Sequence, residues 1–305
     1  MTERDLRGIV PILQTPFTQD GSEIIMEDLE KEIESCVLDG CAGATLFGVA
    51  SEFYKLSDEE CIAMVKTAVK AAKGRIPVIA SITRDATELA CRDAKKYKDL
   101  GVDALMMFSP RFMQPSTDQL TEHIVELANT TDLPFMIQYA PHNGGGIMTA
   151  ASVKEVRKRV KGTLFIKAEP QPAGPFISSL VEADIQPMGI LCGNGGRYML
   201  NIIDRGCQGI MPHCTYQKIF VDVFDHYEAG NREKALELFD MLFKLHYLGA
   251  APAGIEFHKE VLRRRGIFTT SACRRPYNPT PAAVMDEYIA DWESMREKTD
   301  VGCFL

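Results

Sequence analysis

Residues 100–105 read Leu100-Gly101-Val102-Asp103-Ala104-Leu105, a junction at which a helix ends at glycine and a short loop leads into a strand. Glycine just past a helix adopts, at little steric cost, the left-handed conformation that caps it. The same kind of junction recurs at residues 39–44 and 205–210. A repeated helix-to-strand junction predicts a repeated βα unit.

Short apolar runs occur where such a unit places its strands. Stretches with helical periodicity separate them, for example residues 57–72, which open with a capping box of Ser57 and Glu60. Continuous apolar strands that alternate with helices are typical of a parallel sheet covered by helices, and eight units close it into a (β/α)8 TIM barrel. The alternative, an open doubly wound sheet, lacks its glycine fingerprint. The predicted strands are Gly8–Leu13, Ala44–Phe47, Val78–Ser81, Ala104–Phe108, Phe135–Tyr139, Leu164–Lys167, Gly189–Cys192 and Ile210–Met211.

The chain turns helical after the last of these strands. Apolar stripes predict helices over residues 231–248, 254–265 and 281–297. No low-complexity linker precedes them. We therefore expect a barrel domain at residues 1–228 and a C-terminal helical extension, packed on the barrel, at residues 229–305.

Composition and charge exclude several classes of function. The chain is 46% hydrophobic and 25% charged, as in ordinary folded proteins. A net charge of −8 disfavours nucleic acid as a partner, and the basic residues at 154–161 and 263–265 are typical of solvated helix faces. No apolar run approaches a membrane span, and residues 1–5 lack a leader pattern. The nine cysteines form no Cys-x-x-Cys pair, so we expect reduced thiols in a cytoplasmic protein without membrane contact.

Lys167 is the most chemically distinctive residue of the sequence. It closes the apolar run Leu164–Ile166, and strand alternation places it on the same side as Phe165 and Glu169. Burial favours the neutral form of an amine, which can attack a carbonyl to form an iminium. The residues alone leave a structural ion pair between Lys167 and Glu169 equally open.

Several motifs along the chain occur together in one protein family. They are Gly8-Ile9-Val10-Pro11, Thr15-Pro16-Phe17, Gly48–Phe53 followed by Leu56–Glu60, Leu133-Pro134 with Pro141, Ile166-Lys167, and Cys192-Gly193-Asn194. On these motifs the chain resembles the dihydrodipicolinate synthase and N-acetylneuraminate lyase family of Schiff-base lyases over nearly its whole length. The resemblance implies a TIM barrel, a homotetramer built from dimers, and a small 2-oxo acid bound covalently to Lys167. It implies no metal and no redox cofactor.

The turn Gly48-Val49-Ala50-Ser51-Glu52 departs from the family pattern. Relatives carry two hydroxyl residues after the first glycine, where this chain has Val49 and Ala50, so one hydroxyl of the family's proton relay is missing. The backbone N–H groups of Ala50 and Ser51 remain candidates for binding the carboxylate of a 2-oxo acid. The Ser51 hydroxyl either restores the relay or stabilises the turn.

The position of the family's catalytic tyrosine is ambiguous in this sequence. Counting back three residues from Pro141 gives Gln138, whereas counting from Lys167 with the family's spacing gives Tyr139. Adjacent strand residues face opposite sides, so only one of them lines the site. We favour Gln138.

Family members often carry Pro-Tyr-Tyr after the fourth strand, with the second tyrosine reaching a neighbouring subunit. This chain has Pro110-Arg111-Phe112 there, so a second relay hydroxyl is missing. Arg111 is either a ligand of a substrate carboxylate or a solvated loop residue. The arginine that follows the fifth-strand proline in dihydrodipicolinate synthases is also absent.

The remaining candidates follow the last strands. Glu169 shares a face with Lys167 and is a candidate for proton transfer or for pairing with the lysine. We expect Gly193 and Asn194 to approach the substrate with their backbone. Met211 and His213, at and after the eighth strand, complete the predicted substrate-binding set, although a lone histidine also serves structural roles.

Two classes of function follow. The first is a lyase that cleaves, condenses or dehydrates a 2-oxo acid, with dehydration of a 2-keto-3-deoxy sugar acid favoured over cleavage. A dihydrodipicolinate synthase-like condensation of pyruvate with an aldehyde is the alternative reaction. The second class is a non-catalytic sensor that binds a 2-oxo acid, which the missing relay hydroxyls favour. The buried amine of Lys167 favours catalysis, because a sensor does not need it.

Overall fold

The computed structural model describes residues 5–249 and 254–299, and the chain divides into two compact units. The first unit combines Met1–Val10 with Pro77–Met211. The second combines Pro11–Ile76 with Pro212–Leu305.

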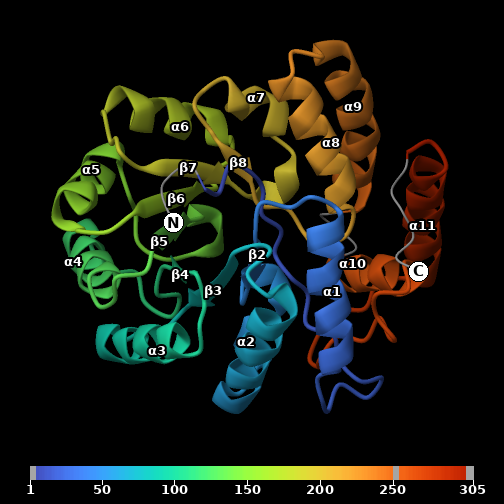
Figure 1. Cartoon of the computed structure of the whole chain (residues 1–305), viewed down its shortest axis with the longest axis horizontal. Coiled ribbons are helices and arrows are strands. Elements are labelled where there is room, and N and C mark those ends of the chain that lie inside the picture. The colour runs from blue at the N-terminus through green and yellow to red at the C-terminus, as the bar shows by residue number, and fades with distance from the viewer. Residues whose placement is uncertain (1–4, 250–253, 300–305) are drawn as a thin grey trace. The chain divides into compact units, whose positions relative to one another are not determined.

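The first unit contains a parallel sheet of seven strands in the order β1-β8-β7-β6-β5-β4-β3. Figure 1 shows α3, α4, α5 and α6 on the outside of this curved sheet. The strands are β1 (Gly8–Ile9), β3 (Val78–Ile82), β4 (Ala104–Phe108), β5 (Phe135–Tyr139), β6 (Leu164–Ala168), β7 (Gly189–Cys192) and β8 (Gly209–Ile210). The helices are α3 (Thr87–Asp99), α4 (Thr117–Ala128), η3 (Pro141–Asn143), α5 (Ala150–Arg159), α6 (Ala173–Glu182), η4 (Asn194–Gly196) and α7 (Met199–Ile203).

Every residue of these strands is buried, which explains their continuous apolar sequences. One face of the sheet is covered by helices and the other faces inward, so side chains on both faces are shielded from water. A charged residue within such a strand is costly unless it is paired. Lys167, near the carboxyl end of β6, is therefore an exception that needs a partner.

The second unit contains β2 and the helices that precede and follow it in the chain. Its elements are α1 (Met26–Leu38), β2 (Ala44–Leu46), η1 (Val49–Ser51), η2 (Phe53–Lys55), α2 (Asp58–Ala72), α8 (Gln217–Glu228), α9 (Arg232–Gly249), α10 (Gly254–Arg264) and α11 (Ala282–Arg296). The helix α9 packs against α8 and α11, and α10 packs against α11 (Figure 1). The three helices predicted after the last strand are thus confirmed. Arg265 departs from the solvated face predicted at residues 263–265, because its guanidinium is buried and donates to the Thr215 carbonyl at 2.6 Å, near the start of α8.

The first predicted strand is shorter than expected. Its regular part ends at Ile9, and beyond Pro11 only Ile12 makes isolated parallel bridges, to Thr45 of β2 and to His213. Pro11 has no N–H to donate, which interrupts a regular ladder. Hydrogen bonds nevertheless continue on alternate residues, with Val10 donating to Ile210 and Ile12 donating to Pro212, each at 2.8 Å.

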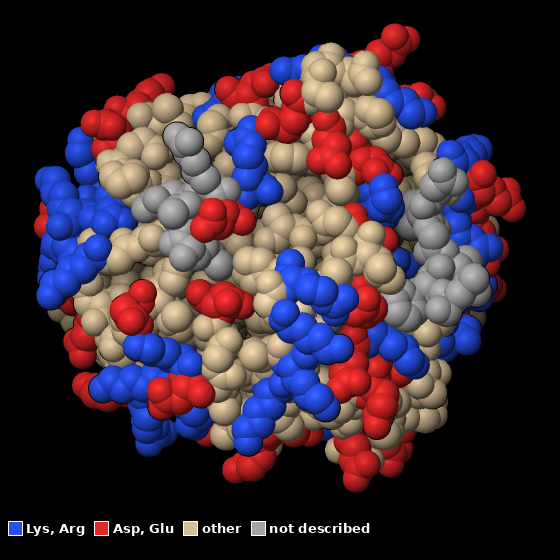
Figure 2. All heavy atoms as spheres, in the orientation of Figure 1, with Lys and Arg blue, Asp and Glu red and all other residues tan. Residues whose placement is uncertain are grey.

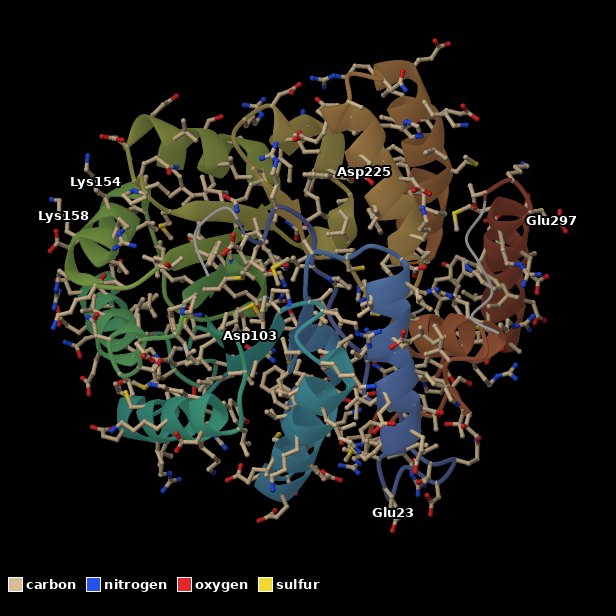
Figure 3. The ribbon with its side chains drawn as sticks, in the orientation of Figure 1. Glu23, Asp103, Lys154, Lys158, Asp225 and Glu297 are labelled. Carbon is tan, nitrogen blue, oxygen red and sulfur yellow. The ribbon has the colours of Figure 1, made fainter. Side chains whose placement is uncertain are left out.

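The basic residues at 154–161 lie on and after α5. Lys154 and Lys158 point outward at the left edge of Figure 3, where Figure 2 shows a concentration of blue side chains. Arg159 forms a bidentate pair with Glu122 at 2.6 Å, and Lys158 lies 3.7 Å from Glu155. This is the solvated helix face that the sequence predicted.

Candidate active site

Lys167 lies in the centre of the sheet of the first unit. It pairs in register with Gln138 of β5 on one side and with Leu191 of β7 on the other. The residue is 3% exposed, and its ammonium nitrogen lies 3.4 Å from Glu169 Oε1. Since the position is buried, this carboxylate is what compensates the charge of the amine before a ligand arrives.

Glu169 is the centre of a small hydrogen-bond network. Its Oε2 accepts from the Gln138 amide nitrogen at 2.6 Å, and its Oε1 accepts from the Asn194 backbone N–H at 3.0 Å. The Asn194 side chain donates to the carbonyls of Glu169 and Pro170, each at 3.3 Å. The carboxylate is therefore fixed in direction beside the lysine, as a proton-transfer group must be.

Gly193 lies directly against the side chains of the lysine and the glutamate. A Cβ atom on Gly193 would overlap Glu169 Oε1 and would lie 2.6 Å from Lys167 Cε. The backbone just after β7 thus leaves no room for a side chain unless Glu169 and Lys167 move. This contact explains why glycine occupies position 193, which had been assigned to the site only through the family resemblance.

The structure separates Gln138 from Tyr139. Gln138 is 2% exposed and contacts Glu169, whereas the Tyr139 ring packs on Phe176 of α6 with centroids 5.0 Å apart. Tyr139 therefore lies on the helix-facing side of β5, away from the lysine row. Of the two candidates, Gln138 is the one that the fold brings to Lys167 and Glu169.

Cys192, the residue before Gly193, is buried. Burial raises the pKa of its thiol well above the ordinary value. Since the thiolate is the nucleophilic form, this cysteine is unsuited to covalent chemistry.

The turn at Gly48–Glu52 belongs to the second unit and is held by its own network. The Ser51 hydroxyl donates to the Leu13 carbonyl, and the Thr15 hydroxyl donates to the Ser51 carbonyl, both at 2.5 Å. The Ser51 N–H donates to the Gly48 carbonyl at 2.9 Å. The Ser51 side chain therefore stabilises the turn, and the Ala50 N–H is the better of the two backbone candidates for a carboxylate.

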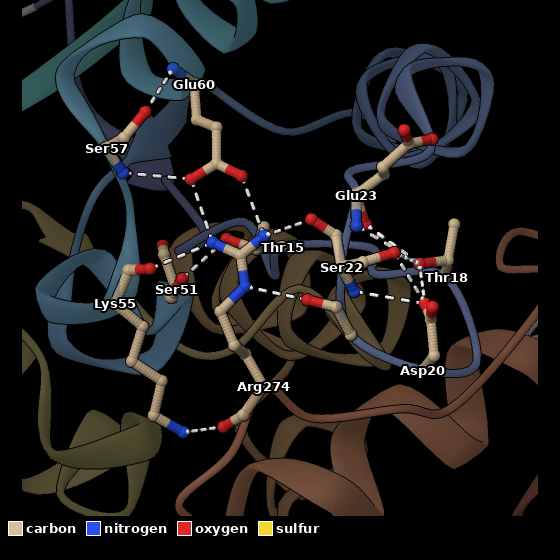
Figure 4. A network of polar contacts seen from close by, with 11 residues as sticks. Thr15, Thr18, Asp20, Ser22, Glu23, Ser51, Lys55, Ser57, Glu60 and Arg274 are labelled. Carbon is tan, nitrogen blue, oxygen red and sulfur yellow. Dashed lines mark hydrogen bonds and ion pairs between the residues drawn. The ribbon is translucent and has the colours of Figure 1, made fainter.

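Residues of the C-terminal region complete this network. Figure 4 shows the Arg274 guanidinium between Glu60 and the backbone carbonyls around it. Arg274 binds Glu60 bidentately at 2.7 and 2.8 Å and donates to the Lys55 carbonyl at 2.9 Å. The predicted capping box of Ser57 and Glu60 is present, so the Glu60 carboxylate both caps the start of α2 and binds Arg274.

Comparison with known proteins agrees with this geometry. The model of the dihydrodipicolinate synthetase family matches residues 5–291. The chain belongs to this family. A 4-hydroxy-tetrahydrodipicolinate synthase of Methanococcus maripaludis is 27% identical over 243 residues, covering 79% of this chain and 82% of that protein. One of Methanocaldococcus jannaschii is 27% identical over 242 residues, covering 78% of this chain and 81% of that protein.

Solved structures show the same relationship. The dihydrodipicolinate synthase of Rhodopseudomonas palustris is 26% identical, with a TM-score of 0.88, and the alignment covers 96% of this chain and 98% of that one. The predicted (β/α)8 barrel is thereby confirmed. As a member of the dihydrodipicolinate synthetase family, the chain is a lyase of the class I aldolase type, a family that works through a Schiff base on lysine.

Arg111 and Phe112, which differ from the family pattern, lie in the loop after β4. The backbone N–H groups of Arg111 and Phe112 donate to Asp85 Oδ1 at 2.8 and 3.3 Å, which fixes the loop after β4. The Arg111 guanidinium lies 5.7 Å from the Phe108 ring centroid, and Phe112 is 95% exposed. Neither Arg111 nor Phe112 carries a hydroxyl, whereas the buried Ser109 stands at the start of this loop.

Met211 and His213 lie in different units. Met211 is buried at the end of β8, and its N–H donates to the Cys192 carbonyl at 2.8 Å. His213 belongs to the second unit and stacks on His258 with ring centroids 3.7 Å apart. The His258 ring nitrogen in turn bonds the Thr215 hydroxyl at 2.9 Å. The histidine therefore has a clear structural role within its unit.

Lys259 was not predicted from the sequence. Its nitrogen lies 2.5 Å from Glu52 Oε1, and both side chains are fully buried. Only the apolar face of α10, formed by Phe257, Val261 and Leu262, hinted that residues 257–262 are buried. Within residues 5–249 and 254–299, no group of three or more His, Cys, Asp or Glu residues is placed to hold a metal ion. No helix in these ranges combines the length and apolar sequence of a membrane span.

Proposed function

We propose that this lyase binds a 2-oxo acid as an iminium on Lys167 and dehydrates a 2-keto-3-deoxy sugar acid. The observation that carries the proposal is the buried group of Lys167, Glu169 and Gln138 on one face of neighbouring strands. A lysine and a carboxylate held 3.4 Å apart supply a nucleophile and a proton-transfer group.

The proposed reaction proceeds as follows. The Lys167 nitrogen attacks the C2 carbonyl as protons move from this nitrogen to the carbonyl oxygen, and that oxygen leaves as water, which gives an iminium. Glu169 takes a proton from C3, and the electron pair forms an enamine. The C4 hydroxyl then departs with that proton as water, which returns Glu169 to its carboxylate form. Hydrolysis of the imine releases the product and regenerates the amine, so the net change is the loss of one water.

Dehydration is favoured over cleavage because of Gln138. Retro-aldol cleavage needs a base to take the proton of the C4 hydroxyl. The side chain at this position of β5 is the amide of Gln138, which does not titrate. Its nitrogen donates a hydrogen bond to Glu169. The amide can orient a hydroxyl without removing its proton.

The Schiff base is tested by borohydride reduction in the presence of pyruvate, followed by mass spectrometry of the digest. We expect one reduced pyruvyl group on Lys167 and none on Lys161, an exposed lysine close to it in the sequence. Unmodified Lys167 under saturating pyruvate overturns the proposal. Modification without turnover of any 2-oxo acid would favour the sensor instead.

We further propose a homotetramer of chains, each with a barrel at residues 1–228 and an extension at residues 229–305. The exposed Phe112, Met113 and Ile147 of the first unit support assembly, because such side chains are commonly covered by a partner. Sedimentation equilibrium gives the mass of the assembly directly, and a monomeric mass contradicts this part. The pyruvate experiment does not depend on it. The cytoplasmic location stays a prediction.

A further inference from the structure

Two Asn-Gly dipeptides lie in loops of the first unit, Asn143-Gly144 after β5 and Asn194-Gly195 after β7. Asparagine followed by glycine is prone to deamidation, because a residue without a side chain lets its backbone nitrogen reach the asparagine carboxamide. The dipeptide alone therefore gives the two positions the same reactivity. Their surroundings in the structure differ.

Hydrogen bonds hold both ends of the Asn194 carboxamide. Its Nδ2 donates to the carbonyls of Glu169 and Pro170 at 3.3 Å each, and its Oδ1 accepts from Gln171 Nε2 at 3.2 Å. The backbone N–H of Asn194 donates to Glu169 Oε1 at 3.0 Å. To react, the carboxamide has to turn toward the next backbone nitrogen, so several of these bonds must break first.

Asn143 has a histidine beside its leaving group. His142 Nε2 lies 3.3 Å from Asn143 Nδ2, the atom that departs as ammonia in deamidation. The Gly144 N–H donates to the Pro141 carbonyl at 3.3 Å, a long hydrogen bond, and a Cβ atom on Gly144 would meet nothing within 4 Å. The attacking nitrogen is thus weakly held, the space around it is open, and an imidazole is in place to transfer a proton.

We propose that Asn143 is a self-catalysed deamidation site, with His142 as the proton donor to the departing ammonia. The Gly144 nitrogen attacks Asn143 Cγ and loses its proton to solvent, which closes a five-membered ring. Nδ2, now an amine, takes a proton from the His142 imidazolium, and the C–N bond breaks to release ammonia and leave a succinimide. His142 regains a proton from solvent. Water then opens the ring to aspartate or isoaspartate, so the net change is one water consumed and one ammonia released.

The product places a negative charge where the chain had a neutral amide. A carboxylate only accepts hydrogen bonds, so the His142 imidazole bonds it by donating from Nε2. In that state Nε2 no longer accepts from Gln171 Nε2, which lies 3.4 Å away. Because Gln171 also bonds Asn194, the change extends to the loop that donates to Glu169. The deamidation itself does not depend on a Schiff base at Lys167.

The test follows both dipeptides in one sample. Folded protein is kept in a mildly alkaline buffer, and mass spectrometry of the digest measures the fraction of each asparagine that is converted with time. We expect Asn143 to convert at least about tenfold faster than Asn194, because Asn194 must first break several hydrogen bonds. In urea the two rates should become similar. A ratio that is the same in folded and unfolded protein, or faster conversion of Asn194 in the folded protein, overturns the inference.

His142→Gln isolates the proton donor. The amide keeps a hydrogen-bonding group next to Asn143 but transfers no proton. Conversion of Asn143 in the folded protein should slow about tenfold, less than the 10²- to 10⁴-fold of a proton donor in an enzyme, because the 3.3 Å contact is long. The rate of each variant in urea corrects for the change of sequence, and circular dichroism shows that the variants are folded.

His226→Gln is the matched control, because it replaces a histidine of α8 in the second unit. This variant should convert Asn143 at the rate of the unaltered protein. Equal rates of Asn143 conversion in His142→Gln and His226→Gln, each corrected by its rate in urea, overturn the proposed self-catalysis.

Discussion

Lys259 of α10 and Glu52 of the turn after β2 form a fully buried ion pair, with Nζ 2.5 Å from Oε1. Lys259 also donates to the Ala272 carbonyl at 3.0 Å and lies 4.4 Å from the Phe17 ring centroid. Glu52 adopts a left-handed conformation, with φ 54°, and its second oxygen accepts from Lys55 at 2.7 Å. The C-terminal extension thus holds the turn that carries Gly48–Ser51.

Removal of one partner of this pair should destabilise the protein strongly. We expect Lys259→Met to lower the free energy of unfolding in urea by about 3–5 kcal/mol, because Glu52 keeps a buried charge. Burial lowers the pKa of Lys259, which shows that the pair is costly to desolvate. Lys259→Met combined with Glu52→Gln should therefore recover much of the loss. The control Lys234→Met, which removes an exposed pair with Glu237, should cost under about 1 kcal/mol.

Gly193→Ala should slow Schiff-base formation strongly without unfolding the protein. The added methyl overlaps Glu169 Oε1 and displaces the lysine. A displacement of about 1 Å costs on the order of 10²-fold in rate, which the rate of borohydride trapping measures. The matched control is Gly162→Ala, whose Cβ would meet only the Leu133 carbonyl at 4.0 Å. Equal trapping rates for the two variants would show that the close approach is unimportant.

Glu32 should make the free energy of unfolding depend on pH. Its carboxyl is fully buried in α1 and accepts from the Gln14 N–H at 2.8 Å. Burial raises the pKa of Glu32 well above its ordinary value of 4.5, so the native state retains a proton that the unfolded chain releases. Stability contributed by Glu32 is thus full below pH 4.5 and falls as pH rises toward the raised value.

Glu32→Gln removes this titration and keeps the acceptor oxygen. The variant should gain stability relative to the unaltered protein as pH increases above 4.5, and the difference should be constant below it. Urea unfolding at several pH values measures this difference. A difference that shrinks with rising pH would contradict the assignment.

The chain should be a poor dihydrodipicolinate synthase. Val49, Ala50 and Phe112 supply no relay hydroxyl, and His142-Asn143-Gly144 follows Pro141 in place of the family's arginine. Loss of a proton-relay member typically costs on the order of 10²-fold or more in rate. A coupled assay with pyruvate and aspartate semialdehyde should therefore stay far below about 10 s⁻¹, the median turnover of enzymes. Turnover at that level would refute the prediction.

Glu169→Gln should lower dehydration by about 10²- to 10⁴-fold, because the amide cannot take the C3 proton. Products of several 2-keto-3-deoxy acids are separated by mass: loss of one water indicates dehydration, and pyruvate plus an aldehyde indicates cleavage. Glu155→Gln, on the exposed face of α5, is the control and should keep full activity. If Glu169→Gln is fully active, Glu169 does not transfer the proton, whichever product forms.

The sequence alone predicted the fold of this protein and the lysine that we propose as its reacting residue. Strand alternation, helical periodicity and glycine caps are local patterns, and they predicted the strands, the capping box at Ser57 and the C-terminal helices. Alternation also predicted that Lys167 and Glu169 lie on one face, because side chains two residues apart in an extended segment point to the same side.

Only the tertiary structure decided which residues of other strands and helices meet them. The choice between Gln138 and Tyr139 depends on the register of β5 against β6, which one residue of slippage would reverse. The need for Gly193 depends on how closely β7 approaches the Lys167 side chain. The pair of Glu52 with Lys259 joins positions 207 residues apart in the chain. Such contacts are set by the packing of distant elements, which leaves no periodic signal in the sequence.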